Sequence, residues 1–124
     1  FILNLMGKNE EALVVTERAL RGSRFPLEKD FNMEAKKRLS QGINTSNAQI
    51  AAVGASPNRA SSLKLINKPT LVIHGTEDPL IPVDHGLYLY ENIPNSKKLI
   101  LEGVGHEIPD QLLTEIIPAI LDNF

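Results

Sequence analysis

The pattern of apolar positions divides the chain into a helical part and a part with strand-like runs. Apolar residues recur at helical spacing through residues 1–64, whereas two strand-like segments, 70–73 and 97–102, contain the continuous apolar runs 71–73 and 99–101. A run without polar alternation is typical of a strand that is covered on both faces in a parallel sheet. A helical pattern that follows Asp84 and ends near Pro94 separates the two runs. The second half of the chain therefore predicts a βαβ unit.

The first half predicts a series of short helices. One is expected between a capping Asn9 and a terminating Gly22, because glutamates open it and arginines close it. A second has an apolar face with a period of four over residues 27–39. A third, short helix is expected through 48–53 and a fourth over residues 59–65.

A last helix is predicted after the second strand. Asp110 is its expected cap, Leu112 and Ile116 lie on its apolar stripe, and Pro118 should kink it because proline has no N–H to donate. The fold class is therefore α/β, with a βαβα unit that contains two parallel strands. Both strands leave apolar edges, so the sheet looks incomplete and its edges favour pairing with another chain.

Two residues of catalytic type follow the two strands. Asp78 lies in the loop after the first run, and His106 follows Gly103-Val104-Gly105 after the second. Consecutive parallel strands end at the same edge of a sheet, where ligands bind in open α/β folds. Taken alone, Asp78 is better explained as a turn or cap residue before proline, and only its combination with His106 on one edge favours the catalytic interpretation. Its neighbour Glu77 is a rival, whose side chain should point away if Asp78 points into the site.

The other polar residues of catalytic type have simpler interpretations. His74 ends a strand of the apolar kind found in buried sheets, and we interpret it as a core histidine whose ring nitrogens are hydrogen-bonded within the fold. His85 lies at the start of a helix. The three histidines show no regular ligand spacing, so no metal site is predicted. None of the seven serines lies in a Gly-x-Ser-x-Gly turn, the usual place of a hydrolase nucleophile. The sequence thus contains a candidate acid and base but no nucleophile.

Composition and charge exclude several classes of protein. The chain of 124 residues is 42% hydrophobic with a net charge of −2, which argues against binding along a nucleic-acid backbone. It has no apolar run of membrane-spanning length. Zero cysteines fit a reducing compartment, so we expect a cytoplasmic location. The chain begins at Phe1 rather than Met, which we interpret as a piece of a longer protein.

The segments Pro69–Pro82 and Gly103–Pro109 resemble the C-terminal part of the α/β-hydrolase fold family. The nearest branch holds esterases and lactonases similar to 3-oxoadipate enol-lactonase and to aclacinomycin methylesterase. The resemblance implies a helical cap segment and return helix in residues 1–64, and a C-terminal βαβα part of the core in 65–124. It also implies that Asp78 is the acid and His106 the base of a Ser-His-Asp triad.

By the same resemblance, the missing nucleophile lies outside this chain. The implied substrate of the parent protein is a carboxylic ester or a lactone, and no metal or organic cofactor is required. We expect the chain alone to be inactive. The alternative is a non-catalytic, truncated module that self-associates through its exposed strand edges.

Overall fold

The computed structural model describes residues 10–26 and 47–123. The chain divides into two compact units, of which the first comprises residues 1–19 and 27–58 and the second residues 20–26 and 59–124. Within the described ranges, no helix combines the length and the apolar character needed to cross a membrane.

The described helices of the first half follow the sequence pattern. Helix α2 covers Glu10–Arg21 and ends before Gly22, whose positive φ of 81° is the left-handed conformation that terminates many helices. Helix α4 covers Asn47–Ala55 and so includes the third predicted helix. The capping residue Asn9 and the predicted helix over 27–39 lie outside the described residues.

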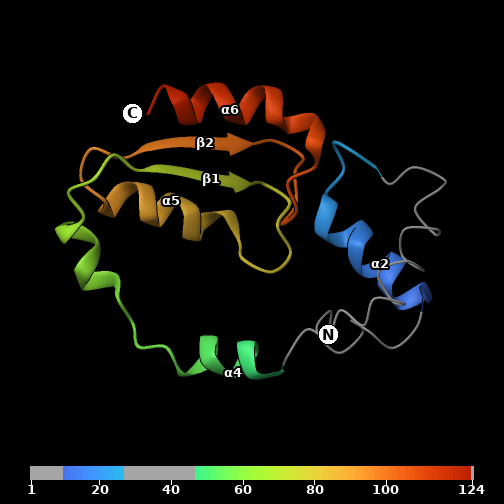
Figure 1. The fold of residues 1–124 in the computed structure, drawn as a ribbon. Helices are drawn as coiled ribbons and strands as arrows, with labels where there is room; N and C mark the ends of the chain where they lie inside the picture. The colour runs from blue at the N-terminus through green and yellow to red at the C-terminus, as the bar shows by residue number, and fades with distance from the viewer. Residues whose placement is uncertain (1–9, 27–46, 124) are drawn as a thin grey trace. The chain divides into compact units, whose positions relative to one another are not determined.

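The second unit contains a parallel sheet of two strands, β1 and β2. In chain order its elements are η1 (Ala60–Leu65), β1 (Leu71–Gly75), α5 (Val83–Asn92), β2 (Lys97–Leu101), η2 (Asp110–Leu112) and α6 (Leu113–Leu121). Ile73 pairs with Leu99 and Gly75 with Leu101, which fixes the register. Helices α5 and α6 lie on opposite sides of the sheet (Figure 1). This arrangement confirms the predicted α/β class and its two parallel strands.

The core of the second unit lies between the sheet and α6. Leu101, Val104, Leu112 and Ile116 form a buried cluster, against which Ile73 and Leu99 pack. Because side chains alternate along a strand, His74 belongs to the opposite face, where it contacts Gly86 of α5. Packing on both faces explains why residues 71–73 of β1 and 99–101 of β2 are apolar without a polar alternation.

Two local predictions need correction. Residues 60–65 form a 3₁₀ helix rather than an α-helix, and none of them is buried, so no packed face favours a longer helix. Asp110 does not cap the last helix: it is the first residue of the 3₁₀ turn η2, and the residue at the N-cap of α6 is Leu112. The buried Leu112 holds this turn against the core, and α6 begins only at Leu113. Pro118 lies inside α6, as its position in the sequence predicts.

The absence of a side chain at Gly105 is expected to stabilise the fold of the second unit. A Cβ at this position would lie 2.1 Å from the carbonyl oxygen of Leu20, a backbone atom that cannot move aside. We expect Gly105→Ala to lower the free energy of unfolding by about 1–3 kcal/mol, as in other overpacked sites. Gly54→Ala is the control, because a Cβ there meets nothing within 4 Å in helix α4. Urea denaturation of both variants checks this, and equal stabilities would contradict it.

Candidate active site

The loop after β1 is held against the loop after β2 by backbone contacts. The amides of Thr76 and Glu77 donate to the carbonyls of Leu101 and Val104 at 3.0 and 2.9 Å. A Cβ on Gly75 would lie 2.2 Å from the Val104 carbonyl oxygen, so only glycine permits this approach. The two loops therefore leave the same edge of the sheet in close contact, as the right-handed crossover predicts.

Asp78 uses its two carboxylate oxygens for two different tasks. Oδ1 accepts hydrogen bonds from the backbone amides of Leu80 at 2.8 Å and Ile81 at 2.9 Å. Oδ2 lies 2.8 Å from Nδ1 of His106, and only 5% of the Asp78 side chain is exposed. The turn and the partnership with histidine, which the sequence leaves as alternatives, are thus present together.

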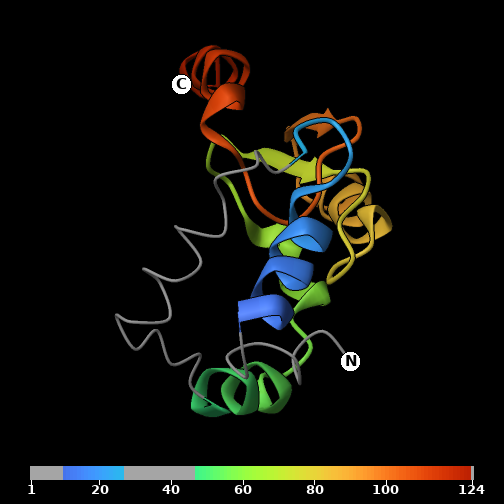
Figure 2. The ribbon, with the colours of Figure 1, turned by 90° about the vertical axis from the view of Figure 1, so that its right-hand side faces the viewer.

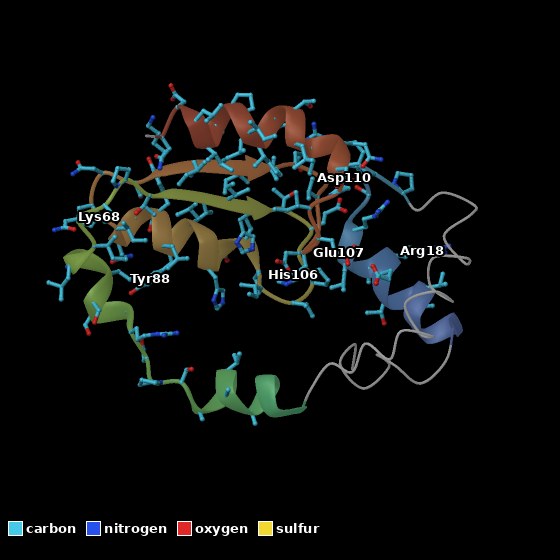
Figure 3. All side chains as sticks on the ribbon, viewed as in Figure 1. Arg18, Lys68, Tyr88, His106, Glu107 and Asp110 are labelled. Atoms are coloured by element: carbon cyan, nitrogen blue, oxygen red, sulfur yellow. The ribbon has the colours of Figure 1, made fainter. Side chains whose placement is uncertain are left out.

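His106 is oriented by Asp78 on one side and open on the other. A carboxylate oxygen only accepts, so Nδ1 carries the proton and the neutral imidazole has its lone pair on Nε2. The side chain is 40% exposed, and it lies beyond the ends of the strands toward which the arrows point (Figure 3). Among the described residues, Nε2 has no hydrogen-bond partner. A buried acid that orients a half-exposed imidazole is an arrangement suited to a general base.

Residues 20–24, here called the brace segment, hold the histidine loop in place. Leu20 and Arg21 accept hydrogen bonds from the amides of Glu107 at 2.9 Å and Gly105 at 3.0 Å, and Arg24 donates to Gly103 at 2.8 Å. The segment that follows α2 accordingly runs beside the C-terminal end of the sheet (Figure 2). The sequence reasoning missed this contact, for which residues 20–24 offer no signal other than Gly22.

Glu77 points away from His106, as expected if Asp78 points toward it. Its carboxylate accepts hydrogen bonds from the backbone amide of Ser23 at 2.6 Å and from the Ser23 hydroxyl at 2.7 Å. Glu77 therefore fastens the brace segment to the loop that contains Asp78. The rivalry between the two neighbouring carboxylates is resolved in favour of Asp78 as the partner of His106.

The other histidines have the predicted environments, with one addition. His74 is only 11% exposed and its Nε2 lies 2.8 Å from the Ile81 carbonyl oxygen, so it is a satisfied core histidine. The same nitrogen lies 3.5 Å from Oδ2 of Asp78, a contact that the sequence reasoning missed. His85 is exposed at the start of α5. In the described part of the chain, no group of three or more His, Cys, Asp or Glu residues could hold a metal ion.

A hollow of about 230 Å³ lies beside the imidazole and the carboxylate. Its lining is mostly apolar and comprises Ile73, His74, Gly75, Asp78, Ile81, Leu101, Val104, Gly105, His106 and Ile108. No serine of the described residues lines it. Three of those serines are engaged elsewhere, with Glu77, the Ala52 carbonyl and the Tyr90 carbonyl as partners of Ser23, Ser56 and Ser96.

The surroundings of Asp78 stabilise its charged form. Burial by itself raises the pKa of the carboxyl, but hydrogen bonds from the Ile81 amide, the His106 side chain and the Leu80 amide lower it, as does the charge of His106. Together the lowering effects outweigh burial, so the pKa lies below its ordinary value of 3.8. Asp78 is therefore a carboxylate at neutral pH and can stabilise a protonated His106.

The lowered pKa of Asp78 makes the stability of the fold depend on pH. A carboxyl whose pKa is lower in the folded chain stabilises it fully above the ordinary value of 3.8, and this contribution is lost as the pH falls through the folded pKa. We expect the difference in unfolding free energy between the unsubstituted chain and Asp78→Asn to shrink on acidification. Denaturant titrations at neutral and strongly acidic pH measure it. The exposed Asp84→Asn is measured in parallel as the control, and a difference for Asp78→Asn that is equal at both pH values would contradict the prediction.

The chain belongs to the alpha/beta hydrolase fold family, whose sequence pattern it matches over residues 15–111. This match confirms the resemblance found in the strand and loop motifs. Over 42 residues the chain is 50% identical to mouse alpha/beta hydrolase domain-containing protein 17C, an alignment that covers 33% of this chain and 13% of the relative.

Solved structures agree with this assignment at the level of the fold. A bromoperoxidase from Bacillus anthracis superposes with a TM-score of 0.72 at 20% identity, over 99% of this chain and 46% of the bromoperoxidase. The esterase RhEst1 from Rhodococcus sp. gives 0.66 at 23% identity, over 93% of this chain and 42% of the esterase. The chain thus spans less than half of either hydrolase-fold structure.

Proposed function

We propose that this chain supplies the acid and the base of a serine hydrolase that cleaves carboxylic esters or lactones, with the nucleophilic serine outside this chain. The observation that carries the proposal is the 2.8 Å contact between Oδ2 of the buried Asp78 and Nδ1 of the half-exposed His106. Membership of the alpha/beta hydrolase fold family and the fold shared with an esterase support it.

The geometry fits acyl transfer in two steps. Nε2 of His106 takes the proton of the serine hydroxyl while the serine oxygen attacks the carbonyl carbon, and Asp78 stabilises the imidazolium. The imidazolium returns this proton to the leaving alkoxide, which departs as the alcohol. His106 then takes a proton from water while the water oxygen attacks the acyl carbon. As the bond between the acyl carbon and the serine oxygen breaks, the imidazolium returns this proton to the serine oxygen, and the carboxylic acid departs. The apolar hollow beside His106 borders the space where this chemistry takes place.

By itself the chain should hydrolyse esters only slightly. Without a serine, His106 acts at most as a general base on water, which provides about 10²–10⁴-fold acceleration. In this proposal the cap segment determines which ester or lactone is the substrate. The proposed location is the cytoplasm, on the basis of the absent cysteines.

The test begins with the coding sequence upstream of the Phe1 codon in the same frame. We expect it to encode a strand followed by Gly-x-Ser-x-Gly, and the longer protein to react with a fluorophosphonate probe at that serine. The 124-residue chain alone should not be labelled. A stop codon or unrelated sequence upstream, or a longer protein that resists the probe, would overturn the proposal.

A second candidate function is self-association without catalysis. Within residues 10–26 and 47–123, each strand of the sheet pairs on one edge only, and α6 exposes Leu113, Ile117 and Leu121. Exposed strand edges are templates for pairing with another chain. Sedimentation of the purified chain distinguishes the two functions: a monodisperse dimer with protected β1 amides favours self-association, whereas a chain that forms no defined dimer favours part of a longer hydrolase.

A further inference from the structure

His74 lies in a place that is shaped for its imidazole. It is the next to last residue of β1, and its ring packs against Gly86 of α5. A Cβ at position 86 would come within 2.6 Å of Nδ1 and 2.9 Å of Cγ of this ring. A glycine in the first turns of α5 thus allows the helix to approach the strand with the imidazole between them.

The imidazole of His74 closes a ring of contacts around Asp78. Its Nε2 lies 2.8 Å from the Ile81 carbonyl oxygen, which only accepts, so Nε2 carries a proton. Ile81 in turn donates its amide to Oδ1 of Asp78 at 2.9 Å. The ring is completed by the 3.5 Å approach of Nε2 to Oδ2 of Asp78.

The loop held by this ring has few other means of fixing its conformation. Pro79 and Pro82 have no amide hydrogen to donate, and Leu80 and Ile81 are exposed. Their two amides both donate to Oδ1 of Asp78. The carbonyl of Ile81 therefore depends on His74 for the hydrogen bond that anchors the loop to the sheet.

We propose that His74 is a positioning residue for Asp78: its Nε2–H holds the Ile81 carbonyl, so that the Ile81 amide stays on Oδ1 and Oδ2 stays turned toward His106. This inference rests on the proposed function of Asp78 and His106 as acid and base. A core histidine that only fills space would be replaceable by any side chain of similar volume. A positioning residue requires the donor at the place of Nε2.

Two substitutions at position 74 separate these roles. His74→Leu keeps an apolar volume but removes the donor, whereas the amide nitrogen of His74→Gln can reach the place of Nε2. Both variants are measured by NMR of the isotopically labelled 124-residue chain. We measure the pKa of the Asp78 carboxyl and the rate of hydrogen exchange of the Leu80 and Ile81 amides. His85→Leu, at an exposed position of the same residue type, is the matched control.

In His74→Leu we expect the pKa of Asp78 to rise toward its ordinary value, because the Ile81 amide bond that lowers it becomes looser. Exchange of the two amides should accelerate about fivefold or more, as expected for the loss of one hydrogen bond. His74→Gln should retain most of the lowered pKa and of the protection. His85→Leu should match the unsubstituted chain.

Gly86→Ala keeps the imidazole but displaces it, and should change the readouts in the same direction as His74→Leu. If His74→Leu does not fold, His74→Gln and Gly86→Ala decide the question. The proposal is overturned if the leucine and glutamine variants behave alike, or if Gly86→Ala leaves the pKa of Asp78 unchanged. These readouts do not involve turnover, so a failure of the proposed hydrolase function is recognised separately, by the absence of probe labelling in the longer protein.

Discussion

Replacing His106 by alanine in the longer protein is expected to reduce ester turnover about 10⁶-fold, the magnitude seen where nucleophile and base act as a unit. His106 is the only described histidine whose Nδ1 is held by Asp78 and whose side chain borders the hollow in a half-exposed position. Without it, the serine hydroxyl keeps its proton and remains a weak nucleophile.

The measurement is kcat for hydrolysis of a p-nitrophenyl ester by the longer protein and its variants. His85→Ala is the matched control, because that histidine is exposed on α5 and does not line the hollow. It should retain nearly normal turnover. If His106→Ala also retained it, His106 would not be the base and the assignment of the site would be wrong.

Asp78→Asn should have the second largest effect, a loss of about 10⁴-fold in kcat. The asparagine Oδ1 can still accept the amides of Leu80 and Ile81, so the turn is preserved. Its amide nitrogen then faces Nδ1 of His106, where the carboxylate oxygen Oδ2 lies in the unsubstituted chain. A donor at that place forces the imidazole to carry its proton on Nε2, where the base needs its lone pair.

The relative loss of kcat in the two variants also tests the assigned roles of His106 and Asp78. Asp78→Asn should remain more active than His106→Ala, since a wrong tautomer is costly but reversible whereas a missing imidazole is not. Asp84→Asn, an exposed acid near the start of α5, should change kcat little. An Asp78→Asn variant that equals the unsubstituted protein would show that the contact with His106 does not serve catalysis.

Much of this site is predictable because it depends on local sequence patterns and on the right-handed crossover between parallel strands. The strand-like segments at residues 70–73 and 97–102 match β1 and β2, and the crossover rule places Asp78 and His106 at the same edge. The opposite directions of Glu77 and Asp78 also agree with the prediction, since the side chains of adjacent residues seldom point the same way. These inferences need no knowledge of contacts between distant segments.

The remaining features depend on such contacts and leave little trace in the sequence. The hydrogen bond between His74 and Ile81 requires the loop to fold back over the strand. The need for glycine at position 86 arises only from the packing of α5 against that histidine. The failure of Asp110 to cap α6 has the same origin, because the burial of Leu112 decides how the chain enters the helix. Local propensity yields to packing at these positions.

The brace segment sets a limit on how this protein can be dissected. A truncation before residue 65 isolates the strands together with Asp78 and His106, yet it also removes the carbonyls of Leu20 and Arg21 that accept the amides of Glu107 and Gly105. Two backbone donors on either side of the imidazole would then be without their partners. The smallest piece that preserves the acid and the base is therefore discontinuous in sequence and needs residues 20–26 spliced to 59–124.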